Sequence, residues 1–226
     1  MYAAELHCHT TASDGRPSPG EVVRRGRSIG LHALAVTDHN TFTGSVIASR
    51  EARGLRGAPV IVYGNEVRTM WGDALILCPE PIPEKAWKGM NPWELREAGD
   101  EYNCVLVAAH PYHLGRHSVG GRAWDRRVFH TVEVWNSRGL ILFNIPAVYR
   151  ARRIGMTGTS GSDAHVLSEL GVAPVMLWDE PRKPVDVVEA IMKGRVRPTY
   201  GIPRVRAIVD AAVWGVRRRM GFRVAW

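Results

Sequence analysis

The sequence of 226 residues contains no glutamine and only three cysteines, Cys8, Cys78 and Cys104. No two of these cysteines form a CxxC pair, and Cys78 and Cys104 lie in apolar, strand-like segments. We therefore expect them to behave as small buried hydrophobic residues, and no disulfide framework is predicted. The absence of glutamine together with abundant arginine is typical of heat-adapted proteins.

Long hydrophobic runs are also absent. No uncharged stretch reaches the roughly 18 residues that a membrane-spanning helix requires, and Glu5 interrupts the segment before His7, so no secretion signal is expected there. Hydrophobic residues nevertheless make up 45% of the chain, which is enough for a sizeable core. We expect a soluble cytoplasmic protein in which residues 1–226 form a single domain.

Acidic residues are fewer than basic ones, with 22 of the former and 30 of the latter, which gives a formal net charge of +8. This excess favours anionic partners such as phosphorylated metabolites or nucleic acid. The basic segment "VRRRMGFR" at 216–223 occurs in proteins that contact nucleic-acid phosphates, but it is more typical of a solvated helix end. Both interpretations remain open from the sequence.

Apolar, strand-like segments alternate with helical patterns along most of the chain. This alternation predicts an α/β fold with a parallel sheet, and about seven strands in this length favour a closed or distorted barrel. Residues 203–226 are predicted to form a C-terminal helix and basic tail packed on this body. The apolar residues at helical spacing are Val205, Ile208, Val209, Ala212, Val213 and Val216.

Polar residues follow the strand-like segments at the point where each segment ends. They are His7, His9, Asp14, Asp38, His39, Glu66, His110, Glu133, Asn136, Asp163 and His165. Each alone could be an ordinary polar residue at a strand terminus. Because the carboxyl ends of parallel barrel strands meet at one edge, their coincidence predicts a shared site there.

These residue types restrict the metal ions that such a site could bind. Imidazoles mixed with carboxylates, without converging cysteines, suit zinc, manganese or iron, whereas calcium and magnesium prefer oxygen ligands. Eight or nine donors exceed the needs of one tetrahedral ion. We therefore expect two or three divalent ions that share bridging carboxylates.

Five short motifs, "HCHTTASDG", "TDHN", "NEV", "AHP" and "SDAH", occur in this order. In this order and spacing they resemble the PHP (polymerase and histidinol phosphatase) domain of metal-dependent phosphoesterases. The resemblance covers residues 5 to about 200. It implies a distorted seven-stranded (β/α)7 TIM-like barrel that carries a trinuclear metal site.

The resemblance also implies a ligand set. One ion would be surrounded by His7, His9, Glu66 and Asp163. Glu66 would bridge to a second ion held by His110, and Asn136 is the candidate for its remaining ligand, since "EVWN" offers neither histidine nor cysteine. The third ion would be held by Asp14, His39 and His165. Asp38 would orient a ligand imidazole.

The activity that the resemblance implies is hydrolysis of a phosphate ester by a metal-activated hydroxide, with a small phosphorylated metabolite or nucleotide as the substrate. Two alternatives are exonuclease-like trimming of short oligonucleotides and a non-catalytic RNA-binding barrel similar to ribonuclease P subunits. Among the loop residues, we expect Arg138 and His113 to contact the substrate. Arg116 and Arg122 are expected to be exposed to solvent.

Overall fold

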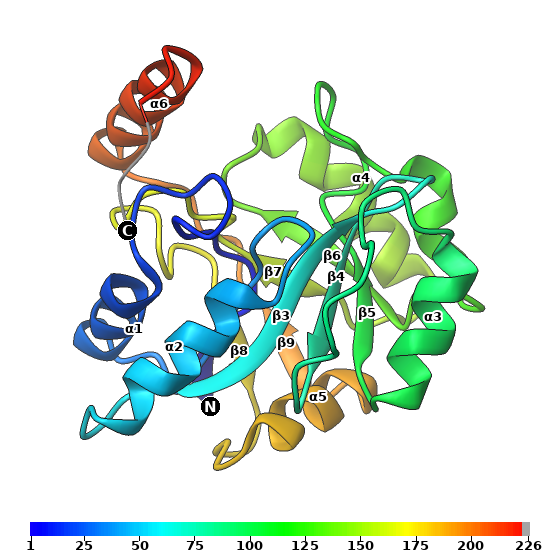
Figure 1. Ribbon diagram of the computed structural model, residues 1–226. Helices are drawn as coiled ribbons and strands as arrows, with labels where there is room; N and C mark the ends of the chain where they lie inside the picture. Colours follow the sequence, from blue (N-terminus) through cyan, green and yellow to red (C-terminus); the bar gives the residue numbers. More distant parts are fainter. Residues whose placement is uncertain (223–226) are drawn as a thin grey trace.

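The computed structural model describes residues 1–222, which form a nine-stranded sheet that curves into a nearly closed barrel (Figure 1). The sheet order is β7-β6-β5-β4-β3-β2-β1-β8-β9. The strands are β1 (Tyr2–Glu5), β2 (Ala33–Val36), β3 (Val60–Arg68), β4 (Asp73–Cys78), β5 (Val105–Ala108), β6 (Thr131–Asn136), β7 (Thr159–Gly161), β8 (Val175–Leu177) and β9 (Val196–Pro198). The helices are α1 (Pro19–Ser28), α2 (Thr43–Arg53), α3 (Pro92–Glu101), the short 3-10 helix η1 (Gly120–Trp124), α4 (Ile141–Arg153), α5 (Pro184–Met192) and α6 (Val205–Arg219).

The barrel-type α/β fold predicted from the sequence is confirmed, although it has nine strands where seven were expected. The sheet also contains antiparallel strands, which raise the number of strands. β4 forms a hairpin with β3, β8 pairs antiparallel with β1, and β9 pairs antiparallel with β8. A hydrogen bond from the backbone N–H of Thr199 to Oγ of Ser160, 3.1 Å long, links the chain after β9 to β7. The two edges of the sheet are thereby joined by a side chain.

Local sequence signals account for the boundaries of α1. At the start of α1, Ser18 accepts a hydrogen bond from the backbone N–H of Glu21, and the Glu21 carboxylate accepts one from the backbone N–H of Ser18. This reciprocal capping satisfies backbone donors that have no partner inside the helix, and Pro19 fits the first turn because it needs no donor there. Gly30, at φ +76°, ends the segment in the left-handed conformation that glycine adopts readily.

The strands are buried on both faces. Val105 and Val107 of β5 point to the barrel interior, whereas Leu106 and Ala108 pack in the outer cluster to which α3 contributes. Alternate side chains of a strand point to opposite sides, so such a strand needs apolar residues at every position. Helix α5 contributes residues to the interior cluster and packs at one end of the barrel, where it lies at the bottom of Figure 1.

The cysteines differ from the sequence-based expectation. Cys78 and Cys104 form a disulfide, with their Cα atoms 4.2 Å apart, so the interpretation of both as separate small hydrophobic residues is wrong. Cys78 ends β4 and Cys104 precedes β5, and the antiparallel register that pairs Leu77 with Val105 places the two cysteines opposite each other. Pairing across strands, which depends on register, cannot be read from cysteine spacing alone.

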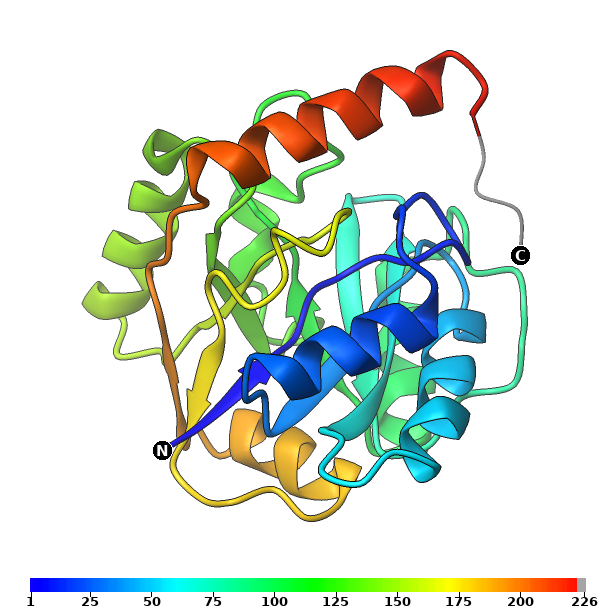
Figure 2. The ribbon, with the colours of Figure 1, turned by 90° about the vertical axis from the view of Figure 1, so that its left-hand side faces the viewer.

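Helix α6 also differs from the expectation. Its helical span is as predicted, but only Ala207 and Trp214 are buried, and the six apolar residues expected to pack on the barrel are exposed. The helix runs across the end of the barrel at which the parallel strands end (Figure 2). Residues 223–226, the end of the predicted basic tail, lie outside the described residues.

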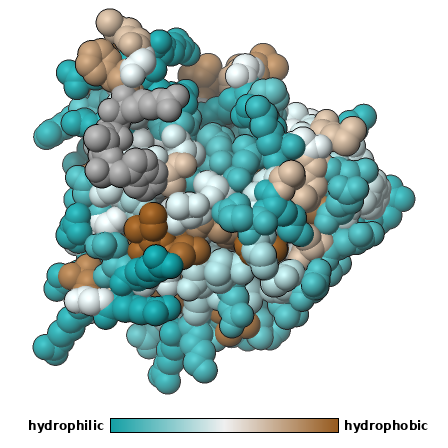
Figure 3. Space-filling view, viewed as in Figure 1, coloured by the Kyte–Doolittle hydropathy of each residue, from teal (hydrophilic) through white to brown (hydrophobic). Residues whose placement is uncertain are grey.

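The face shown in Figure 3 is mainly hydrophilic, with hydrophobic residues in small separate groups. Within residues 1–222, no helix has both the length and the apolar character needed to cross a membrane.

Candidate metal centre

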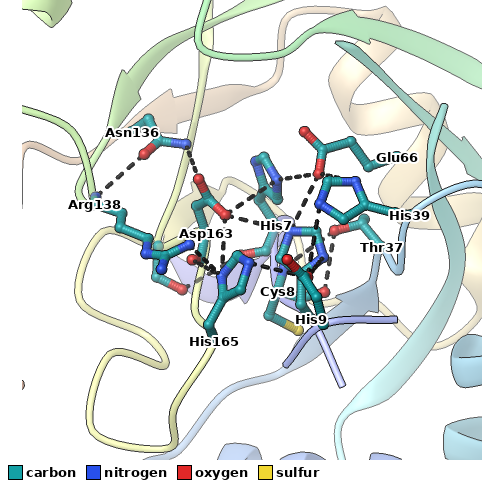
Figure 4. Close-up of polar contacts among 12 residues, drawn as sticks. His7, Cys8, His9, Thr37, His39, Glu66, Asn136, Arg138, Asp163 and His165 are labelled. Carbon is teal, nitrogen blue, oxygen red and sulfur yellow. Dashed lines mark hydrogen bonds and ion pairs between the residues drawn. The ribbon is translucent and has the colours of Figure 1, made fainter. Parts of the chain in front are cut away.

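The polar residues predicted at strand ends converge at one end of the barrel (Figure 4). His7 and His9 follow β1, and their rings lie 5.3 Å apart, while Cys8 between them packs into the outer core next to α1. This confirms that alternate residues converge and that the intervening cysteine faces away. His39 follows β2, and Asp163 follows β7.

Glu66 of β3 occupies the middle of the cluster and lies near four imidazoles. Its Oε2 atom is 3.4 Å from Nε2 of His7, 3.2 Å from Nε2 of His9 and 3.1 Å from Nδ1 of His39. Its Oε1 atom is 3.0 Å from Nε2 of His110. Each oxygen of this carboxylate therefore faces a different group of nitrogens, as a bridging ligand would.

Two further carboxylates lie on either side of His9 and His165. Oδ1 of Asp163 is 3.3 Å from Nε2 of His9 and 3.5 Å from Nδ1 of His165. Oδ1 of Asp14 is 3.1 Å from Nε2 of His165 and 3.7 Å from Nε2 of His39. The structure thus brings eight of the nine predicted ligands into one connected cluster.

The unpartnered atoms of this cluster fit divalent metal ions. Within the described chain, Nε2 of His7, both ring nitrogens of His9, Nδ1 of His39 and Oδ1 of Asp14 are buried without a hydrogen-bond partner. Buried polar atoms without partners are costly. Bonds of about 2.1 Å to a tetrahedral ion would set neighbouring ligand atoms roughly 3.3 Å apart, close to the spacings above.

The pKa values of two histidines in the cluster are raised, because the surrounding carboxylates favour positive charge there. Burial opposes protonation of His9, but the carboxylates of Asp163 and Glu66, 3.3 and 3.2 Å from its Nε2, outweigh burial and raise its pKa to about 10. Burial also opposes protonation of His7, yet the charge of Glu133 and neighbouring carboxylates raises its pKa well above the usual value. Imidazolium protons therefore balance the carboxylates here, and divalent ions would displace them.

Glu133 of β6, left out of the predicted ligand set, holds two of the ligands in place. Its Oε1 is 2.9 Å from Nδ1 of His7, and its Oε2 accepts a hydrogen bond of 2.9 Å from the backbone N–H of His110. A carboxylate on the distal nitrogen of a ligand histidine fixes the tautomer and orientation of the ring. The sequence signal was the strand end "TVEVWN", in which Glu133 and Asn136 both stood as candidates.

Asn136, the ninth predicted ligand, lies beside the cluster, and its side chain is oriented as a hydrogen-bond donor to two carboxylates. Its Nδ2 donates to Oε2 of Glu133 and to Oδ2 of Asp163, and its Oδ1 accepts from the backbone N–H of Arg138. Asn144 of α4 fixes this arrangement by pairing with the backbone of Asn136. The geometry therefore differs from the predicted ligand role and makes Asn136 a residue that orients Asp163.

Asp38 was expected to orient a ligand imidazole, but its carboxylate contacts the loop that contains Thr10 and Ser13. Its carboxylate accepts hydrogen bonds from the backbone N–H and Oγ1 of Thr10, at 2.7 and 2.6 Å, and from Oγ of Ser13 at 2.6 Å. Gly44 packs so closely that a Cβ atom there would lie 1.8 Å from Oδ2 of Asp38. Asp38 therefore positions the turn that carries Asp14.

A cavity of about 160 Å³ opens over the cluster, and arginines form part of its wall. Arg138 places Nη1 2.7 Å from Nδ1 of His165, and Arg116 pairs with Asp163. The expectation that Arg116 is exposed to solvent is therefore wrong. The lining residues are Asp14, His39, Glu66, Arg68, Asp73, His110, Gly115, Arg116, His117, Arg138, Asp163 and His165.

His113 lies behind this cavity and is not among its lining residues. Its Nε2 is 3.2 Å from Oδ1 of Asn144, its ring packs against Phe143, and a Cβ atom at Gly139 would clash with it. Burial and the charge of Arg116 lower its pKa to about 4, so it stays neutral. Its position does not support the predicted substrate contact.

Helix α6 contributes contacts to the cluster that no sequence pattern predicted. Trp214 donates a hydrogen bond of 2.9 Å from Nε1 to the backbone carbonyl of Asp14, and Arg218 pairs with the Asp14 carboxylate. The two residues are four apart and so share one helix face. The basic segment thereby reaches the rim of the metal cluster.

Comparisons with protein families agree with this geometry. Residues 5–118 match the family model described as PHP domain, and residues 142–196 match the model described as PHP-associated. The chain belongs to the PHP family. This membership confirms the resemblance in the five motifs and assigns the chain to the metal-dependent phosphoester hydrolases.

Individual PHP relatives extend over different parts of the chain. An uncharacterised protein of Methanocaldococcus jannaschii is 30% identical over 59% of this chain and 81% of its own length. A 5'-3' exoribonuclease of Haemophilus influenzae is 41% identical over 30% of this chain and 24% of its length. A 3',5'-nucleoside bisphosphate phosphatase of Chromobacterium violaceum is 38% identical over 32% and 25%. The chain thus matches only about a quarter of the length of this exoribonuclease and of this phosphatase.

Among solved structures, PsfC from Pseudomonas syringae superimposes with a TM-score of 0.69, over 98% of this chain and 99% of its own. At 16% identity this similarity establishes the shared fold alone.

Proposed function

We propose that the protein hydrolyses a terminal phosphate ester of a small nucleotide, using two or three divalent ions of zinc, manganese or iron. The observation that carries this proposal is the set of buried, unpartnered imidazole nitrogens and carboxylate oxygens that face one another at 3.1 to 3.8 Å. Ions held there would supply a hydroxide nucleophile at neutral pH by lowering the pKa of water.

The residues of the cluster would have two roles, to hold the ions and to orient the residues that hold them. His7, His9, Glu66 and Asp163 would hold one ion, and Asp14, His39 and His165 another, with Glu66 and His110 facing a further ion. Glu133 and Asn136 keep the ligands oriented. Because the protein fixes these groups before substrate arrives, little reorganisation is needed as charge develops on phosphorus.

Arginines support an anionic substrate. Arg116 and Arg138 pair with Asp163 and the His165 ring on the wall of the cavity. Divalent ions would neutralise the carboxylates and leave the guanidinium groups free to bind phosphate oxygens in a bidentate manner. A nucleotide with a second phosphate would use both the ions and the arginines, which is consistent with the bisphosphate activity of the Chromobacterium relative.

Trimming of oligonucleotide ends is the second candidate, and one specific observation favours it. Arg218 reaches the Asp14 carboxylate, so α6 extends the basic rim beyond the cavity. A longer polyanion could follow this rim, as phosphate contacts by arginine do not depend on sequence. Removal of residues 217–226 should then weaken binding of short RNA and leave hydrolysis of mononucleotides unchanged.

The decisive experiment measures phosphate release from 3',5'-nucleoside bisphosphates, nucleoside monophosphates, histidinol phosphate and 5'-phosphorylated RNA, after the bound metal has been quantified. Asp163→Ala and His39→Ala should abolish release, whereas Asp179→Ala and His32→Ala, at exposed positions away from the cavity, should not. Full activity in either ligand variant would refute the proposal. Release of mononucleotides from RNA, without phosphate release from the small substrates, would favour the second candidate.

A further inference from the structure

Asp73 lies next to Glu66 because of the pairing between β3 and β4. In the antiparallel register Glu66 pairs with Leu75, and Arg68 pairs with Asp73. Residues two apart on a strand share a face, so Asp73 is the diagonal neighbour of Glu66 on the same face of the hairpin. Their side chains can therefore reach a common point.

His110 joins this pair from the other side of β4. The backbone N–H of Ala109 donates to the carbonyl of Asp73 at 3.2 Å, which places His110 beside the start of β4. Glu66, Asp73 and His110 each offer a ligand atom, and these atoms all lie within 4.8 Å of one another. All three residues are at most 3% exposed.

The backbone around Asp73 is fixed by a tight turn. Gly72 has φ +140°, and a Cβ atom there would lie 2.7 Å from backbone atoms of Ser118 and Val119. The backbone N–H of Asp73 donates to the carbonyl of His117 at 2.6 Å. Only glycine permits this close approach, and the turn holds Asp73 against the cavity wall.

The ion pair with Arg68 involves only one of the two carboxylate oxygens of Asp73. Nε of Arg68 lies 3.2 Å from Oδ1 of Asp73, and no hydrogen bond to Oδ2 is present in the described part of the chain. The side chain of Arg68 is 35% exposed, so its charge is partly screened. One partly solvated arginine therefore leaves Oδ2 of the buried Asp73 carboxylate without a partner among residues 1–222.

We propose that Asp73 is the remaining ligand of the ion held by Glu66 and His110, in the role for which Asn136 was expected. The inference rests on the proposed function, because it assumes the metal centre. Asn136 turns its amide nitrogen toward Glu133 and Asp163, so it presents donors where a cation needs acceptors.

The donor types of this site differ from those of its neighbours. Two carboxylates and one imidazole make it the most oxygen-rich of the three, whereas His9, His39 and His165 dominate the site near Asp14. Hard oxygen donors shift preference toward manganese relative to zinc. We therefore expect the ion at Asp73 to be manganese when both metals are offered.

The test counts ions on the full chain. Wild type, Asp73→Asn and Arg68→Met are stripped of metal, equilibrated with manganese, and analysed by elemental analysis and titration calorimetry. Asp73→Asn preserves shape but removes the charged ligand, and Arg68→Met removes the ion pair while keeping the carboxylate. We expect Asp73→Asn to bind one ion fewer per chain than wild type, and Arg68→Met to bind the wild-type number.

An unchanged ion count and affinity in Asp73→Asn would overturn the inference, as would an equal loss in Arg68→Met, which would assign the effect to the ion pair. Circular dichroism and thermal unfolding of the metal-free proteins check that each variant is folded, and Asp73→Ser replaces Asp73→Asn if that variant is not. If Asp73→Asn keeps every ion while wild type still releases phosphate, the inference fails and the proposed function stands. If wild type binds the full set of ions but cleaves no phosphate ester, the proposed function fails independently of Asp73.

Discussion

A comparison of Asp163→Asn with Glu133→Gln should distinguish a direct metal ligand from a residue that orients a ligand. Asp163 faces His9 and His165, whereas Glu133 contacts His7 from behind. Loss of a residue that orients a metal ligand typically costs about 10- to 100-fold in metal affinity or activity. Glu133→Gln should therefore fall in this range, and Asp163→Asn should exceed it, because it removes a charge from the ligand set itself.

Stability of the metal-free protein should fall together with activity. Burial opposes ionisation of Asp163, but Arg116 and the neighbouring imidazoles outweigh burial and hold its pKa well below the usual value, so the charged carboxylate stabilises the fold at neutral pH. We expect the melting temperature of metal-free Asp163→Asn to fall by several degrees relative to wild type.

The assay is the initial rate of phosphate release over a series of manganese concentrations, with thermal unfolding of the metal-free proteins alongside. Saturating manganese should restore much of the activity of Glu133→Gln, because its ligands remain. It should not restore Asp163→Asn. Equal losses in the two variants, or rescue of Asp163→Asn by added metal, would refute the division between ligand and orienting residue.

Three further predictions concern other parts of the chain. The apparent affinity for metal should rise with pH, by about tenfold per unit for each displaced proton, because the pKa of His9 is raised to about 10 and that of His7 well above its usual value, so that protons compete with the metal; calorimetry in buffers of different pH checks this. Reduction of the Cys78–Cys104 disulfide, with a sequence separation of 26, should lower the free energy of unfolding by about 3 kcal/mol, measured by denaturation with and without reductant. Trp214→Ala should expose α6 to proteolysis and leave the melting temperature of the barrel nearly unchanged; a cooperative loss of the whole fold would contradict this.

Much of the fold could be predicted because its signals are local. Alternating strand and helix patterns, the Ser18 cap and the glycine at position 30 depend on neighbouring residues only. The convergence of polar residues at the strand ends followed from the geometry of parallel strands. Hence eight of the nine expected ligands were found together without knowledge of any distance.

The errors arise where strand register or helix docking decides the outcome. The Cys78–Cys104 disulfide depends on how β4 pairs with β5, and the position of Asp73 depends on the hairpin between β3 and β4. The apolar stripe of α6 predicted burial, yet the docked face is the one that carries Trp214.

The sequence by itself determined the element types, the family and the chemistry of the ligands, because these depend on residue identity and short spacing. The tertiary structure decided which atoms face one another: Asn136 as a donor, Glu133 behind His7, and Asp73 beside Glu66. The physical reason is that hydrogen-bond direction and cross-strand pairing depend on contacts between residues far apart in the chain, which no local pattern encodes.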